Sequence, residues 1–346
     1  MKAHAVVPAA VGAERLVGWL PSHDVRDGQG RLVVRKGARL NREAADRVVA
    51  TVRGETHFIE IEPGDLHEDP AGERVARAVA GDGVEVRESA GGQWALVSEG
   101  RGLLRVAVDV LARVNALDGI SVYTLFDGQV VDTGDVVTRA KVTPLVIPEA
   151  TVRDAEALVG QGGVAAVRPF RSRPVAAVGP ENLDSRARSR FERVLREKLG
   201  WLGTSLGRLV FAPPDAGVLA RELEAAITLG AEIVVAAGAN ALDPLDPTFD
   251  AVERLGGRFI RRGVPAHPGS LLWLAEVAGT AVLGMPSCGM FSQATLFDLL
   301  LPRMLAGETI GPAELAALGH GGLLSREMAF RFPPYRAGQE RGAVGD

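Results

Sequence analysis

The second half of the chain alternates between short apolar runs and longer segments with helical spacing. The runs lie at 175–179, 208–212, 233–237, 258–261 and 281–283. Several are apolar at every position, which is typical of strands buried on both faces of a parallel sheet. The intervening segments repeat apolar residues every three or four positions, as amphipathic helices do. Strand and helix therefore alternate, and the pattern predicts a doubly wound, three-layer α/β domain with right-handed crossovers.

The first half has a weaker and more mixed pattern. Asn41 and Asp69 each precede helical spacing and are predicted N-caps, while residues 84–148 read mostly as short alternating strands. We expect an N-terminal α+β region at 1–82 and a β-rich domain at 83–150, followed by a connector. The α/β domain is expected at 173–310, and a C-terminal helix and tail at 311–346, disordered from Gly338 onward.

Composition narrows the class of protein. A chain of 346 residues can form two or three domains, and its net charge of −4 gives no electrostatic reason to bind nucleic acid or an acidic membrane. The only cysteine is Cys288, which excludes an internal disulfide and a cysteine-based zinc site. There is no signal-peptide pattern, and no apolar run approaches the roughly 18 residues that span a bilayer. We expect a cytoplasmic protein.

The stretch from Ala231 to Gly284 is the expected location of the functional site. Gly238 follows one apolar run, Gly284 ends another, and the loop between them carries Asp243, Asp246 and Asp250. Ligands of parallel α/β sheets bind beyond the carboxyl ends of the strands, where glycine allows close approach to the backbone.

The motifs from about 173 to 310 resemble those of the molybdenum-cofactor-biosynthesis domain shared by molybdopterin adenylyltransferases and molybdopterin molybdotransferases. They also occur in the same order along the chain. The pieces that carry this resemblance are Val175–Gly179 with Glu181, Pro213–Asp215, Ala236–Gly238, Asp246–Val252, Gly263–Gly269 and Gly284–Pro286. Residues 60–148 are similar to the N-terminal region of a bacterial subfamily of molybdotransferase-like proteins, some joined to a molybdenum-cofactor cytidylyltransferase domain. The similar segments are Leu66–Asp69, Gly102–Leu104 with Val114–Asn115, and Val136–Val142.

The resemblance implies a site for molybdopterin, a pterin dithiolene with a phosphate, in its free or adenylylated form. Asp246 and Glu181 would be catalytic, arranging Mg²⁺ and molybdate, with Asp246 and Asp243 as metal ligands. Glycine amides at strand ends would hold the phosphate. From their place at a predicted helix start, Ser287 and Ser292 are further possible phosphate donors. The implied ligand-binding residues are Gly179, Gly238, Ala239, Asn240, His267, Pro268, Gly269, Gly284, Pro286, Ser287 and Cys288. A homodimer is implied, and a cytidylyltransferase is a possible partner.

The sequence also departs from that family. The usual Thr-Gly-Asp-Glu at the end of the first strand is Val178-Gly179-Pro180-Glu181, and the usual Gly-Gly is Gly238-Ala239. His267 replaces a lysine, and Ser287-Cys288-Gly289 replaces Gly-Asn-Pro. Because acids and a cation are missing, these departures weigh against catalysis more than against binding.

Each candidate has a simpler structural interpretation. Asp246 is also a good helix N-cap, Gly238 a plain turn, and Cys288 a small buried residue. His67-Glu68-Asp69 could be a metal cluster, but helix capping is the better interpretation.

Three functions remain open. The chain is either a molybdate-inserting enzyme, a non-catalytic molybdopterin carrier, or an unrelated nucleotide- or sugar-phosphate-binding enzyme. The last is weakened by the lack of a GxGxxG fingerprint or P-loop. The molybdenum hypotheses require Gly238, Asp246, Pro268 and Pro286 to face one common pocket.

Overall fold

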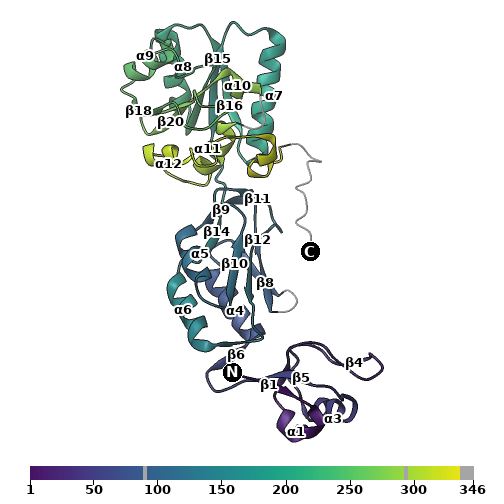
Figure 1. Cartoon of the computed structure of the whole chain (residues 1–346). Coiled ribbons are helices and arrows are strands. Elements are labelled where there is room, and N and C mark those ends of the chain that lie inside the picture. The colour runs from purple at the N-terminus through teal and green to yellow at the C-terminus, as the bar shows by residue number, and fades with distance from the viewer. Residues whose placement is uncertain (89–91, 292–294, 336–346) are drawn as a thin grey trace. The chain divides into compact units, whose positions relative to one another are not determined.

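The computed structural model describes residues 1–88, 92–291 and 295–335. The chain divides into two compact units (Figure 1). The first contains Met1–Gly100, Arg105–Asp127 and Thr133–Val167, and the second contains Arg101–Leu104, Gly128–Asp132 and Arg168–Asp346. Among the described residues, no helix is both long and apolar enough to cross a membrane. Ser292 and the tail predicted from Gly338 lie outside the described residues.

The first unit begins with a small antiparallel sheet in the order β1-β5-β2, beside a short hairpin of β3 and β4. The strands are β1 (Lys2–Val6), β2 (Leu20–Pro21), β3 (Val25–Arg26), β4 (Leu32–Val34) and β5 (Thr56–Glu60). Three helices accompany them: α1 (Pro8–Val11), α2 (Ala13–Leu16) and α3 (Arg42–Thr51). Asn41 caps α3 as predicted, because its side chain accepts a hydrogen bond from the Ala44 amide at 2.8 Å. Trp19 and Phe58 are the largest side chains of the core of this region.

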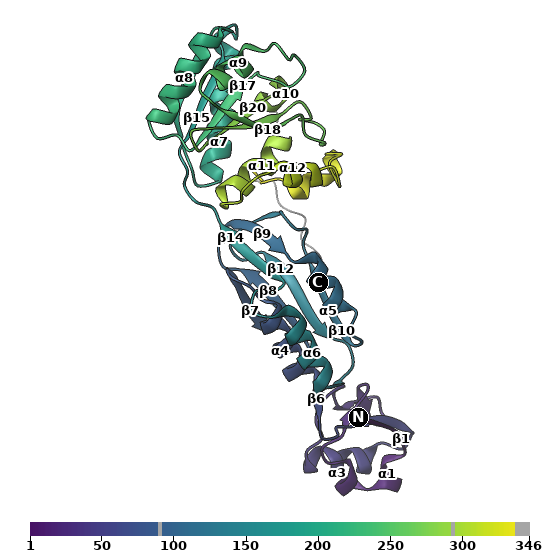
Figure 2. The same cartoon turned by 90° about the vertical axis from the view of Figure 1, so that its left-hand side faces the viewer.

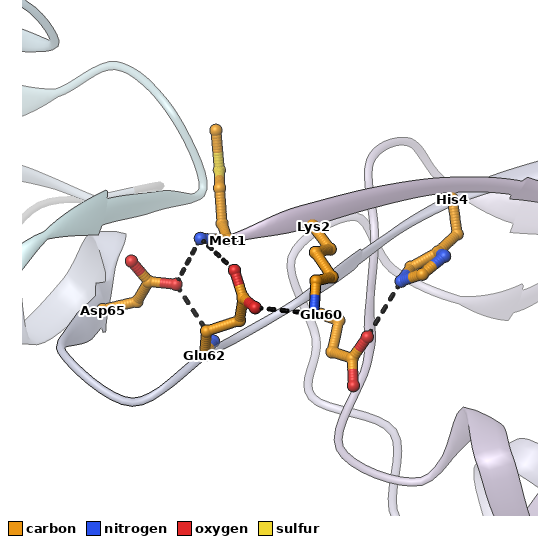
Figure 3. Close-up of polar contacts among 6 residues, drawn as sticks. All are labelled: Met1, Lys2, His4, Glu60, Glu62 and Asp65. Atoms are coloured by element: carbon orange, nitrogen blue, oxygen red, sulfur yellow. Dashed lines mark hydrogen bonds and ion pairs between the residues drawn. The ribbon is translucent and has the colours of Figure 1, made fainter.

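Charged groups connect β1 to the turn that follows β5 (Figure 3). The Met1 amino group lies 2.6 Å from Asp65 Oδ2 and 3.1 Å from Glu62 Oε2. Lys2 Nζ lies 2.8 Å from Glu62 Oε1, and this contact holds the pKa of Glu62 below its ordinary value. Apart from Asp65, whose side chain is buried, these groups are largely exposed, and exposed ion pairs contribute little stability; the contacts therefore fix the path of the chain more than they strengthen the fold.

A four-stranded antiparallel sheet in the order β10-β12-β8-β7 forms the rest of the first unit. Its strands are β7 (Val84–Glu88), β8 (Gln93–Ser98), β10 (Ile120–Thr124) and β12 (Val136–Val142). Helix α4 (Glu68–Val79) packs on β8 and β12, and α6 (Glu149–Val159) lies beside α4 (Figure 2). The remaining elements of this stretch of the chain are β6 (Asp65–His67), β9 (Gly102–Val106), α5 (Val108–Asn115), β11 (Val130–Val131), β13 (Val146–Pro148) and β14 (Ala165–Pro169). β13 pairs with β6, and β11, β9 and β14 form a separate small sheet, of which β11 and the start of β9 are counted in the second unit.

Helix α4 starts earlier than the sequence predicts. We predicted Asp69 as its N-cap, but the cap is His67, whose Nδ1 accepts a hydrogen bond from the Asp69 amide at 3.3 Å. His67 Nε2 also lies 3.0 Å from the Gly37 carbonyl oxygen. Capping is therefore the role of this segment, as preferred over a metal cluster. Among the described residues, no three His, Cys, Asp or Glu side chains are grouped to hold a metal ion.

Asn115, the last residue of α5, closes one edge of the four-stranded sheet. Its side-chain amide donates to the Val122 carbonyl at 2.8 Å and accepts from the Val122 amide at 2.7 Å. The side chain therefore makes both hydrogen bonds that a neighbouring strand would make at this position of β10.

The second unit is a six-stranded sheet in the order β16-β15-β17-β20-β19-β18. Its strands are β15 (Val175–Pro180), β16 (Leu206–Ala212), β17 (Ile233–Ala237), β18 (Arg258–Arg262), β19 (Trp273–Val277) and β20 (Thr280–Met285). The helices are α7 (Ser185–Trp201), α8 (Ala216–Thr228), α9 (Pro247–Arg254), α10 (Ser287–Phe291), α11 (Leu296–Leu305) and α12 (Pro312–Ala317), before a short 3₁₀ segment, η1 (Arg326–Arg331). The predicted doubly wound α/β fold is confirmed.

One strand of this sheet was missed. β19 was not predicted, and it runs antiparallel to both β18 and β20, whereas β15, β16, β17 and β20 are mutually parallel. β19 and β20 are joined by a tight turn in which Ala278 has φ 49° and Gly279 has φ 79°. Positive φ at both central residues is the geometry of a type I′ hairpin turn.

Two cores form on opposite faces of the sheet because alternate residues of each apolar strand point in opposite directions. In β17, Val235 packs with α7 and α11 on one face, while Val234 and Ala236 pack with α8 and α9 on the other. Figure 1 shows α8 and α9 on one side of the sheet and α7 on the other.

The α7 and α11 face also buries an ion pair. Lys198 Nζ lies 2.7 Å from Asp298 Oδ1, and both side chains are almost fully buried. The Tyr335 hydroxyl donates to the same oxygen at 2.9 Å, and Thr295 donates its amide and hydroxyl to Asp298 Oδ2. These contacts fix the first turn of α11 against α7 and the last described residue of the chain.

Candidate functional site

A pocket of about 130 Å³ lies at the carboxyl ends of β15, β16 and β17. It is on the side of the sheet covered by α8 and α9, since Leu219 and Leu223 of α8 and Pro247 and Thr248 of α9 line it. An engineered apolar cavity of about 150 Å³ accepts benzene, so this pocket has room for one ring. The complete lining is Val178, Gly179, Pro180, Ala212, Pro213, Pro214, Leu219, Leu223, Ala236, Ala237, Gly238, Ala239, Asp246, Pro247 and Thr248.

Gly238 forms the turn directly after β17 and lines the pocket. Its φ of 84° is in the left-handed region, and a Cβ there would lie 3.1 Å from Pro180 Cγ. The backbone can therefore follow this path only with glycine at acceptable strain. The Gly238 amide donates to the Met285 carbonyl at 2.8 Å, so it does not serve the phosphate as we expected.

The next two amides are better placed for an anion. In the described part of the chain, neither the Ala239 nor the Asn240 amide has a hydrogen-bond acceptor. Two consecutive open amides after a strand form a common anion-binding arrangement. The Asn240 side-chain oxygen, Oδ1, accepts a hydrogen bond from the Leu242 amide at 2.9 Å. Asn240 itself does not line the pocket.

Asp246 is the one carboxylate among the lining residues. Its Oδ1 accepts from the Thr248 amide at 2.9 Å and caps α9, so the structural interpretation is correct. Its second oxygen remains for a ligand. A single carboxylate can provide one ligand to a hydrated Mg²⁺ whose other ligands are water and phosphate oxygens. The pocket residues therefore fit Mg²⁺ only together with a phosphate-bearing ligand.

The other predicted acids are away from the pocket. Glu181 is exposed, and its backbone is held by Ala212 and Arg188. Asp243 is exposed and accepts from the Leu245 amide, so it does not join Asp246 at a metal site. Asp250 forms a surface pair with Arg254 at 2.7 Å, which lowers the pKa of Asp250.

The predicted turns at 267–269 and 284–288 do not line the pocket either. The Pro268 carbonyl accepts from the Leu296 amide at 3.1 Å, and a Cβ on Gly269 would lie 2.7 Å from Leu296 Cβ. His267 is exposed, and its backbone amide donates to Gly322 at 2.7 Å. These groups belong to the α11 face of the sheet.

The space over Gly284 is filled by an indole ring. A Cβ on Gly284 would lie 1.9 Å from Trp273 Nε1, so this glycine admits a side chain of its own sheet and no ligand. Pro286 is buried, Ser287 is exposed, and Cys288 is the second residue of α10. The expectation of one common pocket is therefore wrong for two of its four positions: Gly238 and Asp246 share it, but Pro268 and Pro286 do not. The geometric requirement of the molybdenum hypotheses is met only by half, and any support for them comes from the Gly238 and Asp246 half of the expected site.

Several lining residues were not predicted. Pro180, Pro213 and Pro214 form apolar walls, and Leu219, Leu223 and Thr248 add helical residues. The two prolines directly after β16 were a usable signal, because a strand that ends in Pro-Pro exposes a rigid apolar turn at the ligand edge of the sheet.

No protein-family model matches the chain, and no curated protein matches it. Among solved structures, it is similar to the molybdopterin biosynthesis MoeA protein from Pyrococcus horikosii (18% identity, 70% of this chain and 79% of that chain, TM-score 0.31). It is also similar to the molybdopterin biosynthesis enzyme MoaB from Thermus theromophilus (17% identity, 40% and 98%, TM-score 0.29). A third is the protein CinA, of unknown function, from Thermoplasma acidophilum (15% identity, 35% and 92%, TM-score 0.28).

Proposed function

We propose that the chain is a molybdenum cofactor biosynthesis protein and that its second unit binds molybdopterin, free or adenylylated. The observation that carries the proposal is the pocket after β17, which is lined by Gly238, by Ala239 with its open amide, and by Asp246; the open amide of Asn240 comes next along the chain but does not line the pocket. The ordered motifs from 173 to 310 support the same ligand. The apolar slot has room for one ring, so it would take one edge of the fused pterin rings, and the open amides beside it would bind the phosphate.

Of the two molybdenum hypotheses, the non-catalytic carrier has the better support. Glu181 does not line the pocket, and Pro180 forms a pocket wall where the resembling family has an acid. A carrier would hold the pterin for a cytidylyltransferase or a molybdoenzyme. The homodimer implied by the resemblance remains a prediction, to be checked by light scattering of the purified chain.

Molybdate insertion is the second candidate, and the free Asp246 oxygen favours it. Mg²⁺ would supply charge neutralisation of the phosphate, and Asp246 would hold and orient the hydrated ion. Reconstitution of an apo-molybdoenzyme with molybdopterin, Mg²⁺ and molybdate tests this activity directly. An active wild type and an inactive Asp246→Asn variant support the enzyme, whereas binding without activity supports the carrier.

Binding itself is tested with two matched cap variants. Asp246 and Asp215 both cap helices, α9 and α8, through one carboxylate oxygen, but only Asp246 lines the pocket. Asp→Ala at either cap should cost about 1 kcal/mol of stability. We expect Asp246→Ala to weaken molybdopterin binding at least about tenfold, while Asp215→Ala binds as wild type. The readout is titration of pterin fluorescence. No binding by the wild type, or equal loss in both variants, contradicts the proposed site.

A further inference from the structure

In the four-stranded sheet of the first unit, α4 covers one face, and the other face is partly exposed. Leu96, Val122 and Ala140 are buried on the face against the helices, where α4 packs on β8 and β12 (Figure 1). On the opposite face Tyr123 is 49% exposed, and Arg139 is only half-buried. An antiparallel sheet commonly leaves one face to water, so openness alone implies no partner.

Strand register places cationic groups on this open face in two rows. Tyr123 is opposite Arg139, Arg139 is opposite Ala95, and Ala95 is opposite Arg87. In the second row Lys141 lies between Ser121 and Gln93. Neighbouring strands are about 4.8 Å apart, so Arg139 and Arg87 flank the small side chain of Ala95 at roughly twice that spacing. The result is a shallow, basic surface with an exposed tyrosine at one side.

Two of these cations have no partner among the described residues. Arg87 Nη2 lies 2.6 Å from Glu85 Oε2. The side chains of Arg139 and Lys141, in contrast, have no hydrogen bond or ion pair with any described residue. Lys141 makes no direct contact with the carboxyl group of Glu68. Burial raises the pKa of Glu68, and the positive charge of Lys141 opposes this rise from a distance. Elsewhere in the unit a cation such as Arg74 holds two glutamates, at 2.9 and 2.7 Å. Two positive charges without a partner among the described residues therefore lie two residues apart on the same face of β12.

We propose that this face binds an extended acidic segment of a partner protein. Arg139 and Lys141 are two residues apart on β12, so their side chains point the same way at a spacing of roughly 6.6–6.8 Å. Alternate side chains of an extended peptide repeat at the same distance. An acid-x-acid sequence lying along β12 therefore meets both cations, and Tyr123 and Ala95 provide the apolar contact beside them.

A protein partner suits the charge of the molecule better than a nucleic acid does. The chain carries a net charge of −4, and nucleic acid binding requires many phosphate contacts from a surface of positive potential. A single exposed tyrosine also falls short of a stacking platform for several bases. This proposal is independent of pterin binding by the second unit.

The test compares two labelled peptides of identical composition, one alternating Glu and Ala and one with all Glu residues in a single block. Binding to the full chain is followed by fluorescence anisotropy at about 0.01 M and about 0.15 M ionic strength. We expect the alternating peptide to bind more tightly, and salt to weaken both complexes. Arg139→Gln combined with Lys141→Gln should weaken the alternating peptide about tenfold or more.

The control is Arg47→Gln with Arg77→Gln, which removes the same charge from exposed helical ion pairs of the same unit. It should change binding less than about twofold. Circular dichroism verifies that both double variants are folded. The proposal is overturned by three results: no binding of the alternating peptide, equal loss in the control, or tighter binding of a single-stranded oligonucleotide of equal charge.

Discussion

The two faces of the six-stranded sheet are built from the same strands but are filled differently. The α7 and α11 face contains the buried Lys198–Asp298 pair, and the turn at 267–269 is hydrogen-bonded to the start of α11 on that face. The α8 and α9 face leaves the pocket beside Gly238 and Asp246. Similar-looking Gly- and Pro-rich turns therefore have different roles, depending on which side chains lie over them: on the α8 and α9 face itself, Trp273 fills the space over Gly284. Four predictions test this difference, beginning with the largest effect.

Lys198→Met should be the most destabilising change on the filled face. It leaves the Asp298 carboxylate buried without its cation, and breaking such a pair costs about 3–5 kcal/mol. Urea unfolding measures the loss. The control is Arg254→Met in the exposed pair with Asp250, where we expect less than about 1 kcal/mol. Similar losses in the two variants would show that the buried pair contributes no more than a surface pair.

Leucine truncation should distinguish the two faces directly. Leu300 is fully buried on the α11 face, so Leu300→Ala should cost about 2–5 kcal/mol. Leu219 lines the pocket, and its side chain already lacks neighbours on one side, so Leu219→Ala should fall below that range. Both values come from denaturant midpoints. A larger loss for Leu219→Ala would contradict the presence of the pocket.

Gly284→Ala tests whether the strand end at Gly284 is filled by Trp273. The added methyl would lie 1.9 Å from Trp273 Nε1, so the indole must move, at a cost of about 1–3 kcal/mol. Gly207→Ala in β16 is the control, since its nearest neighbour to the new methyl is 3.9 Å away. Thermal unfolding compares them. A neutral Gly284→Ala would mean that the space over this strand end is open.

The smallest expected effect is a pH dependence of the stability, caused by Tyr335 on the α7 and α11 face. Burial, with the Asp298 charge beside it, raises the pKa of Tyr335 well above its ordinary value of 10.0. The folded state therefore keeps the phenol proton where the unfolded chain loses it, and stability falls as the pH rises above about 10. Tyr335→Phe should flatten this alkaline decline.

The measurement is the urea midpoint at about pH 8 and about pH 11. Tyr123→Phe is the control, because that side chain is exposed and its removal should leave the decline unchanged. A decline as steep in Tyr335→Phe as in the wild type would exclude Tyr335 as its source.

The sequence was sufficient for the α/β architecture because runs such as 233–237 are apolar at every position and have helical segments between them. It failed at β19, whose turn uses Ala278-Gly279 in place of the Asn-Gly or Asp-Gly that marks such hairpins. The candidate site was predicted only in part, because sequence does not show which side chains lie over a turn. Sequence shows that Gly238 and Gly284 each follow a strand, but the neighbour over each glycine, Pro180 or Trp273, is set by packing between distant segments.

The amide of Asn115 has a consequence for how this protein behaves at high concentration. An outermost strand normally presents a free row of peptide groups to which another copy can add, and repeated addition builds fibres. In β10 the central peptide group, at Val122, is already saturated by that one side chain. Asn115→Ala would uncover it without removing any apolar core residue. In one of the two outer strands of this sheet, β10, a single hydrogen-bonding side chain thus closes the central peptide group to strand addition.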